Sequence, residues 1–185
     1  GTKLMDGQGR VLAGITVGTK ELIDKVYRFS RITGPALSPF NAWVLSKSLE
    51  TLGVRVDRHC ENALALANYL ESHPKVNWVK YPFLKSHPQH ALAQKQMKLG
   101  GCVVAFEVKG GLPAGKHFFD SIKLLSLSAN LGDSRSIVTH PASTTHSKLT
   151  KEERTAVGIT DGMVRISVGL EHIDDIVADI RQALG

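Results

Sequence analysis

The stretch Met163-Val164-Arg165-Ile166-Ser167-Val168 has the two-residue alternation of a strand that buries one of its faces. Val164, Ile166 and Val168 share one face of that strand, and Arg165 points to the other. An amphipathic helix follows, with these residues on one side: Ile173, Ile176, Val177, Ile180 and Leu184. A strand and a helix that each bury one face predict a packed domain at this end of the chain.

Shorter elements are predicted upstream of this strand. Gly110-Gly111 marks a turn, and the capping box Thr150-Lys151-Glu152-Glu153 opens a short helix. The other predicted elements are strands at 76–81, 102–108 and 126–128, helices at 88–99 and 116–125, and a loop at 137–147. This mixture, without internal repeats, predicts an α+β small domain from about residue 55 onward.

The first 54 residues are organised differently. Residues 11–17 form a nearly continuous apolar run, typical of a strand buried on both faces of a parallel sheet. Thr19 is expected to cap a helix that reaches Phe29, and Ser38 a second helix that bends or restarts near Gly53. A third helix carries the stripe Cys60, Ala63, Leu64, Ala67 and Leu70. The chain supplies no neighbours for a strand at 11–17, so we expect a preceding part of its domain to be missing.

The composition is that of an ordinary globular protein. Hydrophobic residues make up 42% of the 185 residues, and no run approaches the roughly 20 apolar residues of a membrane-spanning helix. The net charge is +6, but basic residues are scattered and aromatic residues make up only 6%, which argues against nucleic-acid binding. Cys60 and Cys102 are too few for a disulfide framework and fit a reducing cytoplasm. The chain starts at Gly1 with no signal sequence, as expected of a processed, tagged or excised product.

Three places could carry chemistry on residue type alone. Lys3 can form a Schiff base with a carbonyl cofactor and Thr2 can bind a phosphate, although a surface lysine before a turn is the simpler interpretation. Arg165 can hold a carboxylate through two parallel hydrogen bonds, or it can be an exposed strand arginine. The loop from Ser128 to His146 has small polar residues that suit anion recognition. Its histidines have no metal-ligand spacing, so no metal is predicted, and no G-x-S-x-G segment supports a serine nucleophile.

Taken in order, these segments resemble one enzyme family. Thr2-Lys3-Leu4-Met5-Asp6-Gly7-Gln8-Gly9 is similar to the cofactor-lysine signature of the Cys/Met-metabolism (trans-sulfuration) enzymes, which depend on pyridoxal 5'-phosphate (PLP). The other similar segments are Arg31–Pro39, Leu49–Leu52 with Arg55, Leu131–His146, Gly158-Ile159 and Val164–Glu171. The resemblance covers essentially the whole chain.

The resemblance implies a fold and an organisation. The fold would be α/β, the aspartate-aminotransferase-like PLP fold type I, present as its C-terminal portion. Residues 1–54 would end the large PLP-binding domain, and residues 55–185 would form the α+β C-terminal small domain. The missing N-terminal half would hold the other cofactor contacts, so the chain alone is expected to be inactive. The parent enzyme would be a cytoplasmic homotetramer that binds neither nucleic acid nor membrane.

The resemblance also implies roles for four residues. Lys3 would be the catalytic lysine that binds PLP covalently and moves protons, and Thr2 would bind the cofactor phosphate. Arg165, with Asn130, would bind the α-carboxylate of an amino-acid substrate. Leu4 departs from the pattern, because the family usually has an aromatic residue after the lysine.

A second departure bears on the reaction. Asn130 stands where the lyases of the family commonly have serine, which favours an O-succinylhomoserine or O-acetylhomoserine sulfhydrylase of methionine biosynthesis. Methionine γ-lyase and the cystathionine γ-synthase and γ-lyase activities stay open as alternatives. So do two readings of other classes: a non-catalytic binding or oligomerisation domain, and an enzyme without PLP that uses Arg165 and the polar loop to hold an anionic metabolite.

Overall fold

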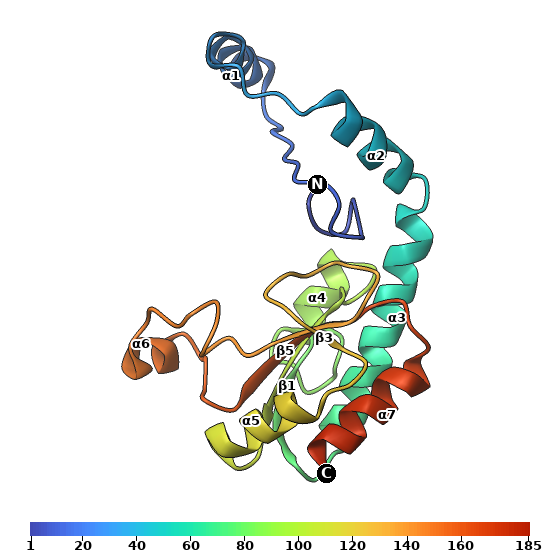
Figure 1. Cartoon of the computed structure of the whole chain (residues 1–185), viewed down its shortest axis with the longest axis vertical. Helices are drawn as coiled ribbons and strands as arrows, with labels where there is room; N and C mark the ends of the chain where they lie inside the picture. The colour runs from blue at the N-terminus through green and yellow to red at the C-terminus, as the bar shows by residue number, and fades with distance from the viewer.

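A computed structural model describes residues 1–185, which form a globular part and an arm that extends from it (Figure 1). The helices are α1 (Lys20–Thr33), α2 (Pro39–Leu49), α3 (Leu52–Glu71), α4 (His90–Gln96), α5 (Gly111–Ser121), α6 (Lys151–Ala156) and α7 (Ile173–Leu184). The strands are β1 (Val76–Lys80), β2 (Val103–Val108), β3 (Ser126–Leu127), β4 (Ile137–Thr139) and β5 (Met163–Ser167). Helices α1 and α2 form the arm, and none of the seven helices is both long enough and apolar enough to cross a membrane.

The globular part is built on one five-stranded sheet. Its strand order is β1-β2-β5-β4-β3, in which only the β3–β4 pair is parallel. Four residues lie opposite one another across four strands: Lys80, Ala105, Arg165 and Thr139. Strand β5 is therefore central, and Arg165 has paired neighbours on both sides.

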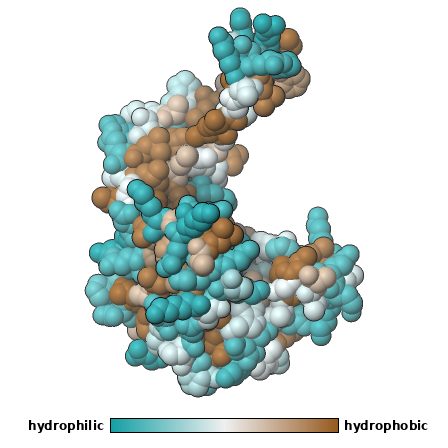
Figure 2. Space-filling model, turned by 180° about the vertical axis from the view of Figure 1, so that it is seen from behind, coloured by the Kyte–Doolittle hydropathy of each residue, from teal (hydrophilic) through white to brown (hydrophobic).

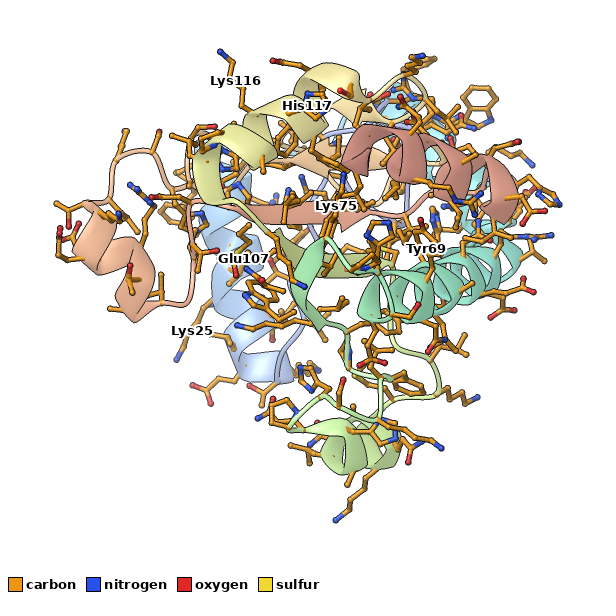
Figure 3. The ribbon with its side chains drawn as sticks, turned by 90° about the horizontal axis from the view of Figure 1, so that it is seen from below. Lys25, Tyr69, Lys75, Glu107, Lys116 and His117 are labelled. Carbon is orange, nitrogen blue, oxygen red and sulfur yellow. The ribbon has the colours of Figure 1, made fainter.

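One face of this sheet is covered by helices. Val104, Phe106, Val164 and Ile166 are fully buried, while Val103, Ala105, Met163 and Arg165, which alternate with them, are only partly buried. These buried residues join one core cluster with side chains from α3, α5 and α7. Helices α3 and α7 lie side by side, and the Arg181 guanidinium of α7 lies 5.7 Å from the ring centre of Tyr69 on α3 (Figure 3). As predicted, Arg165 therefore lies on the sheet face opposite to the core.

The strand predicted at residues 11–17 is wrong. This segment forms no ladder in the chain, and Leu12 and Val17 are 82% and 85% exposed. A β-strand needs a partner to satisfy its backbone groups, and the chain supplies none here. Together with Phe40 and Trp43 of α2, this segment leaves an apolar surface on the arm (Figure 2).

Three further predictions differ from the structure. The helix expected at 116–125 is α5, which starts at Gly111 and ends at Ser121, because the Asp179 carboxylate accepts hydrogen bonds from the backbone N–H groups of residues 123–125. The loop expected at 137–147 contains the three-residue strand β4, which pairs with β5. The helix expected at 88–99 is shortened to α4.

The predicted helix caps are confirmed. The side chains of Thr19, Ser38 and Thr150 each accept a hydrogen bond from a backbone N–H in the first turn of their helices, and Thr150 forms a full capping box. Helix α1 runs past Phe29 to Thr33 and ends at a left-handed glycine. The chain restarts as α3 at Leu52, so Gly53 lies within a helix.

We expect Phe118→Ala to lower the free energy of unfolding by about 3–5 kcal/mol, since it leaves a cavity in the core. Phe118 is fully buried, and its ring packs edge-on against Phe106 at 5.7 Å between centres. Urea unfolding of the chain would measure the loss. Phe40→Ala, at a side chain 68% exposed, is the matched control and should cost less than about 0.5 kcal/mol. Equal losses in the two variants would contradict the position of the core.

Candidate active site

Lys3 lies in a compact loop at the start of the chain. The backbone N–H of Gly7 donates to the Lys3 carbonyl at 2.8 Å, and that of Asp6 donates to Gly1 at 3.0 Å. The Asp6 carboxylate is buried and accepts hydrogen bonds from the backbone N–H groups of Arg10 and Val11 and from the Arg10 guanidinium. Burial raises the pKa of Asp6, but these hydrogen bonds outweigh burial and hold the pKa below its usual range. The ionised carboxylate therefore closes the loop.

The Lys3 side chain meets the loop that follows β3. Its Nζ atom donates a hydrogen bond to Oδ1 of Asn130 at 2.5 Å, across 127 positions of sequence. The backbone of Gly132 packs against the same loop, because a Cβ atom there would lie only 2.8 Å from the backbone nitrogen of Leu4. The N–H of Ser134 also donates to the Gly7 carbonyl at 2.7 Å. Lys3 is thus tied to the sheet part of the chain.

Arg165 reaches the same loop from β5. Its Nη2 atom donates to the carbonyls of Ala129 and Asn130 at 3.0 and 3.4 Å and to Oγ1 of Thr139 at 3.4 Å. Its Nε atom is buried and has no hydrogen-bond partner. Burial lowers the pKa of Arg165, but a guanidinium stays protonated at neutral pH. The structure thus brings Lys3, Asn130 and Arg165 together, with Asn130 touching both cations.

Thr2 is engaged elsewhere. Its hydroxyl oxygen accepts from the N–H of Ala13 at 3.0 Å and donates to the Ala13 carbonyl at 3.2 Å. The structure therefore places this hydroxyl against the chain's own backbone, beside Lys3 in sequence. Its assignment to a phosphate stays a prediction.

The two loop histidines do not meet. Nδ1 of His140 lies 2.7 Å from the Ser143 hydroxyl and its Nε2 lies 3.0 Å from the Asp161 carbonyl. His146 Nδ1 instead pairs with the Thr145 hydroxyl at 2.8 Å. No group of three or more His, Cys, Asp or Glu side chains in residues 1–185 has the arrangement of a metal site.

Sequence reasoning missed two buried polar residues of α3. Nδ1 of His59 donates to the Val168 carbonyl at 2.6 Å, and Nδ2 of Asn62 donates to the carbonyls of Gly169 and Glu171 at 3.0 and 2.9 Å. The turn after β5 is therefore fixed from the helix side. Nε2 of His59 and Oδ1 of Asn62 are buried without partners in the chain. Their i, i+3 spacing within an apolar helix stripe is the signal that could have revealed them.

The site fits one end of a PLP-binding centre. The exposed primary amine of Lys3 lies beside the partly buried guanidinium of Arg165, whose buried Nε has no hydrogen-bond partner. That donor can take an anionic oxygen, such as one from a carboxylate, and the amine can take an aldehyde.

Comparison with known proteins gives a consistent result. The family model described as "Cys/Met metabolism PLP-dependent enzyme" matches residues 1–185. The L-methionine gamma-lyase of Treponema denticola is 50% identical over 186 residues, which cover 99% of this chain and 46% of that protein. The O-succinylhomoserine sulfhydrylase of Mycobacterium tuberculosis is 51% identical over 189 residues, which cover 100% of this chain and 47% of that protein. The chain thus spans about half the length of these curated relatives.

Solved structures agree with the sequence relatives. Cystathionine gamma synthase from Xanthomonas oryzae pv. oryzae, in complex with cystathionine, matches with a TM-score of 0.93 at 38% identity over 99% of this chain and 48% of that one. A putative O-acetylhomoserine (thiol)-lyase from Campylobacter jejuni, which carries a pyridoxyl-lysine monophosphate, matches with a TM-score of 0.89 at 35% identity over 99% of this chain and 52% of that one.

We expect the stability of the chain to fall as the pH drops below about 6.5, partly because of His59. Burial lowers the pKa of His59, and the nearby Arg55 lowers it further, against opposing effects of the Val168 carbonyl, Glu171 and Asp133. Folding thus favours the neutral ring of His59. The contribution of His59 to stability is complete at a pH above the pKa that this histidine has in the unfolded chain. It is lost as the pH falls, because the unfolded chain then binds a proton at His59 more readily than the folded chain does.

Urea unfolding at pH 7.5, 6.5 and 5.5 tests this expectation. His59→Asn keeps a donor for Val168 but does not titrate, so its stability should change less over this range. His117→Asn, at an exposed histidine of α5, is the control and should keep the pH dependence of the unaltered chain. An unchanged pH dependence in His59→Asn would contradict the assignment.

Proposed function

Because the chain belongs to the Cys/Met metabolism family of PLP-dependent enzymes, we propose that it is the C-terminal portion of an enzyme acting on sulfur amino acids. The resemblance recognised in the sequence, the α/β fold class and the PLP cofactor of the family are confirmed. The observation that carries the proposal is the contact of Asn130 with both Lys3 and Arg165. This contact supports the proposed roles, in which the Lys3 amine binds the cofactor and the Arg165 cation binds the substrate.

Lys3 holds the cofactor and moves protons in this proposal. When bound, PLP supplies an electron sink for charge that develops on the substrate. The Nζ atom of Lys3 takes and returns protons at the substrate carbons, and the hydrogen bond to Asn130 orients that atom. Thr2 would bind the cofactor phosphate once its hydroxyl turns away from Ala13.

Arg165 binds the α-carboxylate of the substrate. Its Nη2 is already fixed by two backbone carbonyls, so the guanidinium is oriented before the substrate arrives. Its buried, unpartnered Nε leaves a donor whose desolvation costs roughly 1–3 kcal/mol, and a carboxylate oxygen would offset that cost. An amino acid is therefore the substrate class that the site suits.

The N-terminal half of the parent protein is the proposed partner of the arm. Residues 1–54 would complete the large PLP-binding domain with that half, and residues 55–185 would be the small domain. The support is the exposed apolar surface around Val17, Phe40 and Trp43, which a monomeric protein rarely leaves open to water. The cytoplasmic homotetramer expected from the resemblance remains part of the proposal.

Among the reactions of the family, we favour γ-replacement by an O-succinylhomoserine or O-acetylhomoserine sulfhydrylase that makes homocysteine for methionine biosynthesis. Asn130 supports this choice, since the lyases commonly have serine there. A methionine gamma-lyase and an O-succinylhomoserine sulfhydrylase are each about 50% identical to the chain, so overall sequence identity does not distinguish the two activities. The alternative is a methionine γ-lyase or a cystathionine γ-synthase or γ-lyase.

Covalent labelling tests the role of Lys3. We expect a chimera that joins the N-terminal half of the Mycobacterium tuberculosis sulfhydrylase to this chain to carry a pyridoxyl group on Lys3 after PLP and borohydride treatment. Peptide mass analysis should show at least about tenfold more label there than on the exposed Lys47, because only Lys3 lies in the site. The chain alone should show weak, scattered labelling and no turnover. Label spread equally over Lys3 and Lys47 in the chimera would contradict the proposal.

Substrate choice is tested in the same chimera. With sulfide present, we expect acylated homoserines to give homocysteine with a kcat/KM at least about tenfold above that for methionine cleavage, a difference of roughly 1.4 kcal/mol in activation free energy. Asn130→Ser should shift this ratio toward cleavage, and Ser147→Ala, at an exposed serine away from Asn130, is the control. Dominant methionine cleavage by the unaltered chimera would reject the sulfhydrylase assignment.

A further inference from the structure

Arg55 lies behind the Lys3 loop, at the start of α3. Its side chain is largely buried, with 9% of the residue exposed. Its guanidinium donates to the carbonyls of Leu4 and Met5 at 2.7 and 3.1 Å, and to the Ser48 carbonyl at 2.9 Å. Its Nε donates to the hydroxyl of Thr51 at 3.1 Å. One side chain thus ties the two residues after Lys3 to the junction of α2 and α3.

The loop is shaped to admit this guanidinium. A Cβ atom on Gly7 would lie 2.1 Å from Nη1 of Arg55, and the positive φ of Gly7 (+74°) also favours glycine. The nearby carboxylate of Asp6 is taken by Arg10, so Arg55 is left to the carbonyls. The planar guanidinium of Arg55 has several N–H donors in fixed directions, which suits carbonyl groups that approach it from different sides. The single ammonium group of a lysine could not reach all of these carbonyls.

The opposite side of the loop is closed by Gly132. A Cβ atom there would lie 2.8 Å from the nitrogen of Leu4 and 3.1 Å from the carbonyl carbon of Lys3. Gly132 is itself fixed, because its N–H donates to the Ser167 hydroxyl of β5 at 2.8 Å. The peptide between Lys3 and Leu4 is thus held between Arg55 and the loop that carries Asn130.

We propose that Arg55 is a positioning residue for Lys3. Arg55 holds the backbone next to Lys3 so that the Nζ atom of the lysine points at Asn130. The importance of that direction rests on the function proposed for Lys3, but the positioning itself does not require the cofactor. Arg55 touches neither the Lys3 amine nor Arg165, and it acts through the carbonyls of Leu4 and Met5.

A cofactor-free cross-link measures this positioning in the full chain. In an Asn130→Asp background, a carbodiimide joins Nζ of Lys3 to the introduced carboxylate only while the two groups stay adjacent. We expect Arg55→Met to lower the cross-link yield at least about fivefold, since charge-assisted hydrogen bonds to the loop are lost. Arg55→Lys should restore part of the yield. Arg58→Met, at an exposed arginine one turn along α3, should leave it unchanged.

Hydrogen exchange separates local from global effects in the same variants. The N–H of Gly7, bonded to the Lys3 carbonyl, should exchange faster in Arg55→Met, while the N–H groups of β2 and β5 should not. If Arg55→Met also speeds exchange in the sheet, the cross-link yield of Arg55→Lys tests the positioning instead, because this variant keeps the charge and loses only the planar guanidinium.

An unchanged cross-link yield in both Arg55 variants would overturn the proposal, and so would equal loss in Arg58→Met. If the cross-link responds as expected but the chimera carries no label on Lys3, the proposed function fails while the positioning by Arg55 stands. The two ideas are thus tested by separate measurements.

Discussion

Three buried polar side chains of helix α3 hold the candidate site together. Arg55 binds the loop that carries Lys3, His59 binds the carbonyl of Val168, and Asn62 binds the carbonyl of Gly169. They recur along one side of the helix at intervals of four and three residues, which brings them to a common face. Buried donors without partners are costly, so each bond fixes the loop that it meets. The helix thereby sets the lysine loop and the end of β5 in one frame.

The sheet contributes a second constraint, because helices cover only one of its faces. The buried face, with Val104, Phe106 and Ile166, gives the small core its stability. The opposite face is left for polar side chains, and Arg165 stands there between paired neighbours on β2 and β4. A guanidinium on a central strand of a packed sheet has little freedom to move, and this makes it suitable for holding a carboxylate.

The loop that carries Lys3 joins the arm to the sheet part of the chain. The chain spans about half the length of the relatives that it matches, and its arm leaves an apolar surface uncovered (Figure 2). The Lys3 loop nevertheless packs against the sheet part through Gly132 and Ser134. The contact between the Lys3 amine and Asn130 is therefore built within these 185 residues.

The sequence alone determined the elements whose signals are local. The alternation around Arg165, the apolar stripe of α7 and the caps at Thr19, Ser38 and Thr150 all depend on residues within about four positions of one another. The ordered motifs also pointed to the family and to a set of site residues. Tertiary structure decided the rest: strand β4 exists because β5 pairs with it, α5 stops where Asp179 captures the next backbone amides, and residues 11–17 lack a partner. The meeting of Lys3 with Asn130 and the grip of Arg55 join residues 127 and 51 positions apart, and no local periodicity encodes contacts over such separations.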